Sequence, residues 1–349
     1  MHPRSSLLVS FSFHLTAPPS SMDTVLSITS SMKVSMPFQI LLILCIVLGL
    51  FHLLKAFLSL SQWVWDSFLM PVKNLKRYGS WAVVTGPTDG LGKPIVLGLA
   101  RLGLNLVLVG SDPAKLSSVA GEIHAKFESV KVRSIVVDFS REVDEGMKRI
   151  EEGIKMLDVG ILINNGGIEL PYIRFVHEVE VEDIGRIIRV NLEALTRVTH
   201  VVLPLMVKKR RGIILNLGSA SGSVLPAHPL SALYGATKAY IHHFSKTLNL
   251  EYKRFGIHVQ CQAPFFVATE LTGMKASFFV PTADDYAEWS LRWIGNHDRS
   301  VCSPHWAHSI LWLGASLLPE PLLNMVVFRV MLRRQETRKK EKENARRKE

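Results

Sequence analysis

The stretch WAVVTGPTDGLG, residues 81–92, decides the fold. Its apolar start predicts a buried β-strand, and a helical pattern begins at Lys93 directly after it. Gly86, Gly90 and Gly92 would let the backbone turn tightly and approach a pyrophosphate, which the N–H groups of the following helix would then bind. Three glycines after a strand also occur by chance, so this interpretation depends on the rest of the chain.

Short apolar, β-branched runs alternate with helical patterns over much of the chain. The predicted strands are residues 81–86, 104–110, 132–138, 159–165, 212–219 and 257–264, and helical segments such as 112–127 and 142–157 separate them. Strands that alternate with helices predict an α/β fold: a Rossmann-type, doubly wound parallel sheet with helices on both faces. We expect this dinucleotide-binding domain to span residues 78–275.

A second motif, Asn164-Asn165-Gly166-Gly167, lies at the end of the fourth predicted strand. Amides and small residues at the carboxyl end of a parallel strand suit a place where a cofactor lies against the backbone. The alternative is an ordinary turn, because Asn-Gly is a strong turn signal.

A third motif combines Tyr234 and Lys238, four residues apart, with Ser221 thirteen residues before the tyrosine. Positions i and i+4 share one face of a helix, so we expect Lys238 beside Tyr234. Lowering a phenol pKa by about three units needs on the order of 4 kcal/mol, which an ammonium and an oxidised nicotinamide can supply. Ser221 would hold a carbonyl oxygen, and Asn191 a water that replenishes the proton. The alternative is a helical surface pair.

The order and placement of these motifs resemble the short-chain dehydrogenase/reductase family. Within it, residues 78–90, 158–165, 259–262 and 267–269 are similar to the very-long-chain 3-oxoacyl-CoA reductases of microsomal fatty acid elongation, and to plant members in particular. These enzymes are related to the 17β-hydroxysteroid dehydrogenases. The resemblance covers about residues 36–330.

The resemblance implies a catalytic tetrad of Tyr234, Lys238, Ser221 and Asn191. The cofactor contacts that it implies are Gly86, Asp89, Gly90, Leu91, Gly92, Ser111, Asp138, Asn165, Tyr234, Lys238, Val267 and Thr269. This sequence departs from the family pattern at Gly166, which replaces an alanine, and at Ser111, where an arginine often holds the 2′-phosphate. Ser219 and Ser223 flank Ser221, so the identity of the working hydroxyl stays open.

The end of the second predicted strand indicates the cofactor. An acidic residue there would bind the ribose 2′-hydroxyl and repel a phosphate, but Gly110 occupies the position. Asp112 could restore part of that repulsion, whereas Lys93 and Ser111 could meet the phosphate instead. We therefore expect NADPH.

The resemblance implies reduction of a very-long-chain 3-oxoacyl-CoA to the 3-hydroxyacyl-CoA, with hydride added at C3 and a proton given by Tyr234. An acyl path could be lined by Phe265, Phe266, Phe278, Phe279, Trp289 and Trp293, or these side chains could pack a lid. Two alternatives stay open: reduction of a ketosteroid, and a weakly active paralogue that serves as a scaffold in an elongase complex. Chain length and oligomeric state are not indicated.

Residues 36–60 predict a transmembrane anchor. Residues 36–54 are almost wholly apolar, and crossing a bilayer needs roughly 20 such residues. Because Lys55, Lys73, Lys76 and Arg77 follow the segment, the positive-inside rule places the catalytic domain in the cytosol, at the endoplasmic reticulum if the resemblance holds. A signal peptide is the alternative.

The Ser-rich residues 1–35 predict a disordered or targeting leader, unless the true start is Met22, Met32 or Met36. Residues 276–332 could be a lid with C-terminal helices of the same domain, or helices on the membrane surface. Residues 333–349 predict a basic, disordered tail.

Charge and cysteine content argue against a nucleic acid partner, a metal site and a disulfide framework. The chain has 41 Lys+Arg against 30 Asp+Glu, a net +11, but ten basic and four acidic residues from Arg329 onward account for +6 of it. The remainder is only mildly basic, so a nucleic acid partner is not expected. Three cysteines without paired spacing argue against a metal site or a disulfide framework.

We predict that the protein resists extraction from membranes by alkaline carbonate, because residues 36–54 would lie within the bilayer. Deleting residues 36–60 should weaken this resistance, measured as the share of protein in the membrane pellet. Release of the full-length chain by carbonate would show that the segment is not a span.

Overall fold

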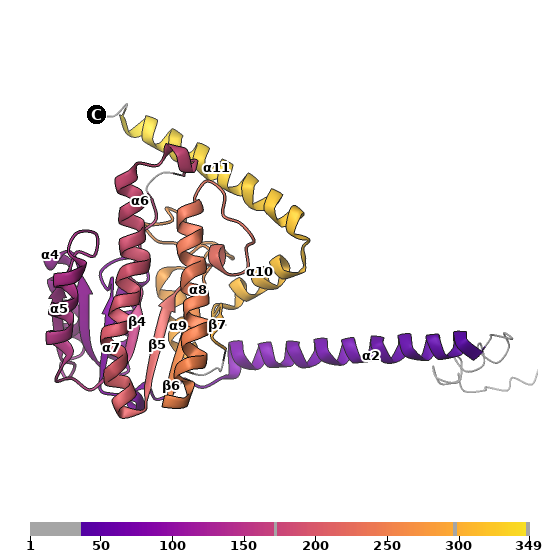
Figure 1. Cartoon of the computed structure of the whole chain (residues 1–349), viewed down its shortest axis with the longest axis horizontal. Helices are drawn as coiled ribbons and strands as arrows, with labels where there is room; N and C mark the ends of the chain where they lie inside the picture. Colours follow the sequence, from indigo (N-terminus) through magenta and orange to yellow (C-terminus); the bar gives the residue numbers. More distant parts are fainter. Residues whose placement is uncertain (1–35, 171–172, 296–298, 347–349) are drawn as a thin grey trace, which may run out of the picture. The chain divides into compact units, whose positions relative to one another are not determined.

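The computed structural model describes residues 36–170, 173–295 and 299–346 (Figure 1). The chain forms two compact units, one ending at Phe68 and the other beginning at Leu69. The predicted leader, residues 1–35, lies outside the described residues, as do residues 347–349 of the predicted tail.

A parallel sheet forms the centre of the second unit, in the strand order β3-β2-β1-β4-β5-β6-β7. Its strands are β1 (Trp81–Thr85), β2 (Asn105–Gly110), β3 (Val132–Val136), β4 (Val159–Asn164), β5 (Gly212–Leu217), β6 (Ile257–Gln262) and β7 (Val301–Cys302). The doubly wound fold and the six predicted strands are confirmed, and the two-residue β7 adds an edge that periodicity cannot detect. The strand order reverses between β1 and β4, the usual position of a ligand site in such sheets.

The helices that follow the strands cover both faces of the sheet, and Figure 1 shows α7 and α8 across one of them. The α-helices of this unit are α3 (Gly92–Arg101), α4 (Pro113–Lys126), α5 (Val143–Ile154), α6 (Val181–Ile188), α7 (Leu195–Lys209), α8 (Ala232–Tyr252), α9 (Ala283–Trp293), α10 (Trp306–Leu317) and α11 (Glu320–Arg346). The π-helix η4 (Arg189–Ala194) joins α6 to α7, and short 3-10 helices are η2 (Leu75–Tyr78), η3 (Val176–Glu178), η5 (Ala220–Gly222) and η6 (Lys253–Phe255).

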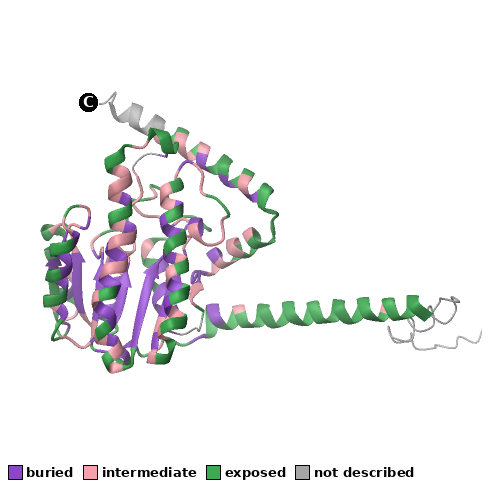
Figure 2. Cartoon of the chain, viewed as in Figure 1, coloured by how far each residue is buried: buried purple, intermediate pink, exposed green. Residues whose placement is uncertain are grey.

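Alternation along each strand divides the apolar core into two layers. On β1, Ala82 and Val84 pack with side chains of α3, α4 and α9, whereas Val83 packs with those of α5 and α7 on the other face. Successive side chains point to opposite faces of a strand, so a sheet covered on both sides has strands that are apolar throughout. Figure 2 shows the central strands buried for this reason.

Buried amides fix the carboxyl ends of the central strands. Asn164 of β4 donates through Nδ2 to Asn216 Oδ1 of β5 and to Thr199 Oγ1 of α7, both at 2.9 Å. Asn216 donates in turn to Ser245 Oγ of α8 at 2.9 Å. Buried polar groups that are paired in this way restrict the core to one arrangement, so the network sets α7 and α8 against the edge where the site lies.

The predicted disorder of residues 333–349 is wrong for the described part, because α11 continues as one helix to Arg346. Leu323, Val327 and Met331 pack against Ile173 and Leu230. Spacings of three and four continue this stripe through Arg334 and Arg338, whose guanidiniums reach the rest of the domain. The helix is therefore anchored before its charged end begins, which the composition of the tail alone concealed.

The remaining C-terminal segments also belong to the second unit. Residues 276–332, which could have been helices of the same domain or a membrane-bound segment, supply α9, β7, α10 and the start of α11. Exposed apolar side chains nevertheless remain on α10 and α11, among them Leu313, Leu317 and Leu322.

The first unit contains α2 (Met36–Val64), followed by the π-helix η1 (Trp65–Leu69). Figure 2 shows α2 exposed along its length, and none of its residues is buried. By length and composition, Met36–Leu69 is a candidate membrane span, somewhat longer than the predicted 36–60. Val181–Lys209 also passes that test, but half of its apolar window is buried inside the domain, as in a core helix.

A close backbone contact joins η5 to α8 and yields a test of stability. A Cβ added at Gly222 would lie 2.2 Å from both Ala239 N and Lys238 C. We predict that Gly222→Ala lowers the free energy of unfolding by about 1–3 kcal/mol, because neither backbone can retreat without disturbing the packing. Chemical denaturation of the full-length protein in detergent measures this.

Gly121→Ala in α4 is the matched control, because a Cβ there meets nothing within 4 Å. It should leave stability unchanged or raise it by up to roughly 1 kcal/mol. Equal stability of the Gly222 variant and the unmodified protein would show that the contact has room to relax.

Candidate functional site

The glycine-rich loop after β1 adopts a shape that other residues would not permit. Gly86 and Gly90 have φ of +61° and +55°, in the left-handed region where glycine is favoured. A Cβ at Gly92 would lie 1.9 Å from the carbonyl oxygen of Gly86. The loop leads into α3, whose N-terminus has no side-chain cap. Gly92 N donates to the Asp89 carbonyl at 3.0 Å and Pro94 has no N–H, so within the first three residues of the helix the Lys93 N–H and the positive end of the helix dipole are what would meet an anion.

The second motif supports this loop. Asn165 donates from Nδ2 to the Gly86 carbonyl at 2.7 Å, and Gly166 N donates to Thr85 Oγ1 at 3.0 Å. A Cβ at Gly86 would lie 2.8 Å from the Cα of Gly166, so the two loops pack backbone against backbone. The turn interpretation of this motif is thus too narrow, because these residues form the support of a cradle that fits a dinucleotide pyrophosphate.

A cavity of about 360 Å³ opens at the carboxyl ends of the central strands. Nine predicted site residues line it: Asp89, Gly90, Leu91, Asn165, Ser221, Tyr234, Lys238, Val267 and Thr269. Five predicted residues do not line it: Gly86, Gly92, Ser111, Asp138 and Asn191. The two glycines shape the loop beneath the cavity, and the other three have separate surroundings.

Tyr234 and Lys238 stand together on α8, as their spacing predicted. Lys238 Nζ lies 5.5 Å from the centre of the Tyr234 ring and donates to the carbonyl of Leu217, the last residue of β5, at 2.8 Å. Ser221 Oγ donates to Ser219 Oγ at 2.9 Å, and Ser219 is the hydroxyl that bonds to the side chain of Tyr234. Both Ser219 and Ser221 line the cavity, whereas Ser223 does not.

Burial dominates the protonation of this pair. It raises the pKa of Tyr234, and Glu169 raises that pKa further; the hydrogen bond with Ser219 and the charge of Arg334 lower it only in part. Burial also lowers the pKa of Lys238 to about 8. Lys238 is not among the groups that lower the pKa of Tyr234 in the protein alone, where desolvation disfavours both charged forms. The lowering of the phenol pKa by Lys238 together with an oxidised nicotinamide stays a prediction. Tyr234 is a protonated hydrogen donor at neutral pH.

Asn191 is buried in the π-helix η4, and its side-chain amide is hydrogen-bonded to the backbone of Ile168. Its Oδ1 accepts from Ile168 N at 2.8 Å, and its Nδ2 donates to Ile168 O at 2.9 Å and to Thr237 Oγ1 at 3.1 Å. These bonds fix the segment after β4 against α8. The predicted role in holding a water remains a prediction.

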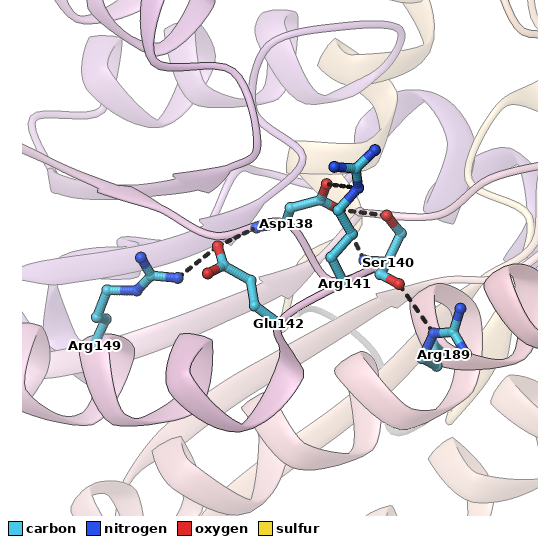
Figure 3. Close-up of polar contacts among 6 residues, drawn as sticks. All are labelled: Asp138, Ser140, Arg141, Glu142, Arg149 and Arg189. Atoms are coloured by element: carbon cyan, nitrogen blue, oxygen red, sulfur yellow. Dashed lines mark hydrogen bonds and ion pairs between the residues drawn. The ribbon is translucent and has the colours of Figure 1, made fainter.

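Asp138, after β3, lies in a polar cluster that Figure 3 shows. Its Oδ1 accepts from Ser140 N at 2.9 Å and Ser140 Oγ at 2.6 Å, while its own N–H donates to Glu142 Oε1 at 3.2 Å. Arg149 pairs with Glu142 at 2.6 Å, and Arg189 donates to the carbonyl of Ser140 at 3.0 Å. The cluster fixes the loop, and Asp138 is half-buried at the end of its strand.

The carboxylate next to the end of β2, that of Asp112, is already hydrogen-bonded to its neighbours in the chain. Ser111 is exposed, and Asp112 Oδ1 accepts from Ala114 N at 2.9 Å and from Lys115 N at 3.1 Å as the N-cap of α4. Lys93 pairs with Glu122 at 2.9 Å and Lys115 with Asp89 at 2.8 Å. Burial favours a higher pKa for Asp89, but hydrogen bonds from Lys115 and Thr88 outweigh it and lower that pKa.

Sequence reasoning missed four ionisable residues of the cavity: Glu169, His228, Glu270 and Arg334. Burial raises the pKa of Glu169 and lowers that of His228 to about 4. Glu169 lies two residues after the end of the Asn-Gly motif, close to a predicted site, and Arg334 falls on the buried stripe of α11. His228 lies in a loop without a pattern, so only the fold identifies it.

The six aromatic residues that were predicted to line an acyl path do not lie together. Phe265 and Phe266 line the cavity. Phe278 and Phe279 are exposed, and Trp293 is buried with Met70 and Cys302. Trp289 packs edge-on against His305. An acyl path along all six side chains is therefore not what the fold provides.

Comparison with known proteins agrees with this geometry. Residues 80–278 match the short chain dehydrogenase family. An Arabidopsis thaliana protein described as very-long-chain 3-oxoacyl-CoA reductase-like is 45% identical over 300 residues, covering 83% of this chain and 93% of the relative. A human protein described as inactive hydroxysteroid dehydrogenase-like protein 1 is 39% identical over 253 residues, covering 70% and 74%. A solved short-chain dehydrogenase from Sphingobium yanoikuyae in complex with NADPH has a TM-score of 0.59 at 30% identity, covering 67% and 91%.

The buried amine of Lys238 predicts a pH-dependent stability. Its pKa is about 8 in the folded chain against 10.5 for an ordinary lysine, so the unfolded chain binds more protons between these values and stability rises with pH across that window. Lys238→Met should therefore raise the free energy of unfolding at pH 7 by roughly 1–3 kcal/mol. The difference should shrink as pH rises from 8 to 10.5.

Denaturation of the cofactor-free protein at pH 7 and pH 10 measures both effects. Lys246→Met, on the exposed side of α8, is the control and should show no such pH-dependent gain. A Lys238 variant that is less stable at pH 7 and equally so at pH 10 would mean that burial of the amine carries no penalty.

Proposed function

This chain belongs to the short-chain dehydrogenase family, and on that premise we propose that it reduces very-long-chain 3-oxoacyl-CoA to 3-hydroxyacyl-CoA with NADPH in fatty acid elongation. The observation that carries the proposal is one cavity in which Tyr234, Lys238 and the serine hydroxyls face the glycine cradle. The substrate class is supported by the similarity to the Arabidopsis reductase-like protein, which extends over nearly its whole length.

The proposed chemistry follows from the groups in the cavity. Bound NADPH would supply the hydride. The hydroxyls of Ser219 and Ser221 hold the C3 carbonyl oxygen, and Tyr234 gives that oxygen its proton. Burial keeps Tyr234 protonated at neutral pH, which is the form that reduction requires. Lys238 is held by the Leu217 carbonyl, so its amine stays beside the phenol as charge develops.

The choice of NADPH is supported by the end of β2. Gly110 ends the strand without a carboxylate, and Asp112 is engaged as a helix cap. The end of the strand therefore lacks the carboxylate that would bind the ribose 2′-hydroxyl and oppose a 2′-phosphate, and Ser111 provides no guanidinium to hold that phosphate. The glycine loop and the uncapped start of α3 would hold the pyrophosphate.

Location at the endoplasmic reticulum membrane, with a cytosolic domain and other elongase subunits as partners, belongs to the same proposal. Met36–Leu69 is a candidate span; Lys55 lies within it, and Lys73, Lys76 and Arg77 follow it. Apolar side chains exposed on α10 and α11 would rest at the lipid surface, near the source of a very-long-chain substrate.

Two other functions are tested by the same assay. The human relative described as inactive makes a scaffold without activity a real alternative, and its name also points to hydroxysteroids. Membranes that contain the chain should oxidise NADPH when given 3-oxoacyl-CoA and should do so faster than with a ketosteroid. Faster steroid reduction would favour the second function, and no reaction with either would favour the scaffold.

We predict that Tyr234→Phe and Lys238→Ala each lower kcat by at least about a hundredfold, because general acid catalysis of this kind contributes 10²–10⁴-fold. The protein should still bind NADPH after Tyr234→Phe. Turnover close to that of the unmodified enzyme in either variant would contradict the assignment.

The same assay identifies the working serine. Ser219→Ala and Ser221→Ala remove hydroxyls that line the cavity, and Ser223→Ala is the matched control outside it. The larger loss should belong to the hydroxyl that holds the carbonyl oxygen, and Ser223→Ala should be nearly silent.

For the cofactor, we predict that kcat/KM is higher with NADPH than with NADH and that Ser111→Arg widens the preference by roughly tenfold. A guanidinium binds phosphate through two parallel hydrogen bonds. Gly110→Asp should shift the preference toward NADH, and a side chain fits there because the nearest atom to an added Cβ lies 3.4 Å away. A clear preference of the unmodified enzyme for NADH would refute the choice.

A further inference from the structure

The cavity contains a second cation that the proposed chemistry does not use. Arg334 of α11 lines it together with Ser221 and Tyr234, although it lies a hundred residues beyond either in the chain. The guanidinium carbon lies 4.6 Å from the centre of the Phe266 ring, and one nitrogen donates to the Thr272 carbonyl at 3.3 Å. The stacking and this bond fix the plane of the guanidinium.

Holding the charged side chain of Arg334 in this position costs folding free energy. Among the described residues, no carboxylate pairs with it, and most of its five N–H donors have no protein acceptor. Burial lowers its pKa. Glu169 and Glu270 share the cavity, but neither forms an ion pair with it, and Ser231 is the residue that donates to Glu169, at 3.3 Å. A half-buried guanidinium with unused donors favours a ligand that is rich in oxygen acceptors.

The helix that carries Arg334 is anchored on both sides. Leu323, Val327 and Met331 pack on Ile173 and Leu230, and Gln335 Nε2 donates to the carbonyl of Ile173 at 2.8 Å. Because α11 is held in this way, the guanidinium is already in place before a ligand arrives. Preorganised donors of this kind discriminate between ligands at a small entropic cost.

The substrate itself indicates which acceptor Arg334 meets. A 3-oxoacyl thioester has a second carbonyl, at C1, two carbons from the ketone that the serines and Tyr234 would hold. The phosphates of coenzyme A lie far beyond it, at the end of the pantetheine arm, whereas Arg334 lines the same cavity as Ser221 and Tyr234. The group that comes within reach of Arg334 is therefore the thioester carbonyl.

We propose that Arg334 recognises the thioester carbonyl of the 3-oxoacyl substrate and so selects β-ketothioesters over ketones that lack a second carbonyl. This inference rests on the proposed function and deepens it. Arg334 acts as a substrate-binding residue, and Tyr234 remains the proton donor.

The test compares two thioesters of one 3-oxoacyl chain, the coenzyme A ester and the uncharged N-acetylcysteamine ester, with the full-length protein in detergent. Arg334→Met should lower kcat/KM for both esters by a similar factor, roughly ten- to a hundredfold, as expected when a charge-assisted hydrogen bond is lost. The dissociation constant of NADPH should change less than twofold, because Arg334 is not among the residues expected to contact the cofactor.

Arg338→Met is the matched control. Arg338 also donates to the Thr272 carbonyl, at 3.4 Å, and to Leu271 O at 2.9 Å, but it does not line the cavity. It should change kcat/KM by less than threefold. If Arg334→Met no longer binds NADPH, Arg334→Lys decides instead and should still lose several-fold on both esters.

Three results overturn the inference. A loss of kcat/KM confined to the coenzyme A ester would mean that Arg334 binds a phosphate. Unchanged kcat/KM for both esters would mean that Arg334 does not bind the substrate. An equal loss in Arg338→Met would mean that Arg334 only holds the loop. Failure of the proposed function looks different, because the unmodified enzyme would then reduce neither ester.

Discussion

Side-chain amides at the carboxyl ends of β4 and β5 are the constraint on which the site depends. Asn164 and Asn216 bond to each other and to α7 and α8, and Asn165 bonds to the carbonyl of Gly86. These bonds join the glycine loop, the end of the sheet and the helix of Tyr234. Parallel strands end at one edge, so a few amides there can position groups from distant parts of the sequence.

The cavity keeps charged groups where burial opposes their charge. Lys238 and Arg334 have lowered pKa values, and Tyr234 and Glu169 have raised ones, each with burial as the main cause. Such an arrangement reduces stability and persists where the groups serve a ligand or a reaction. The same desolvation strengthens their electrostatic effect on a bound carbonyl.

The C-terminal helix α11 contributes both to the cavity and to the exposed apolar surface. Its apolar stripe attaches it to the loops around Ile173 and Leu230, and the continuation of that stripe delivers Arg334 to the cavity. Other apolar side chains of α10 and α11 remain exposed. A helix that reaches the cavity while presenting apolar surface would suit the long acyl chain of the proposed substrate, which partitions into lipid.

The sequence by itself determined the parallel sheet, the glycine loop, the pairing of Tyr234 with Lys238 and the apolar segment at 36–60. Each depends on neighbours within one strand, turn or helix, where spacing dictates which side chains face the same way. Only the tertiary structure decided that Ser219 contacts Tyr234, that Asn191 is bound to Ile168, that the charged tail is helical and that Arg334 enters the cavity. These features depend on contacts between segments far apart in the chain. Burial, which governs the pKa values of Tyr234 and Lys238, likewise belongs to the folded whole and has no signature in the local pattern.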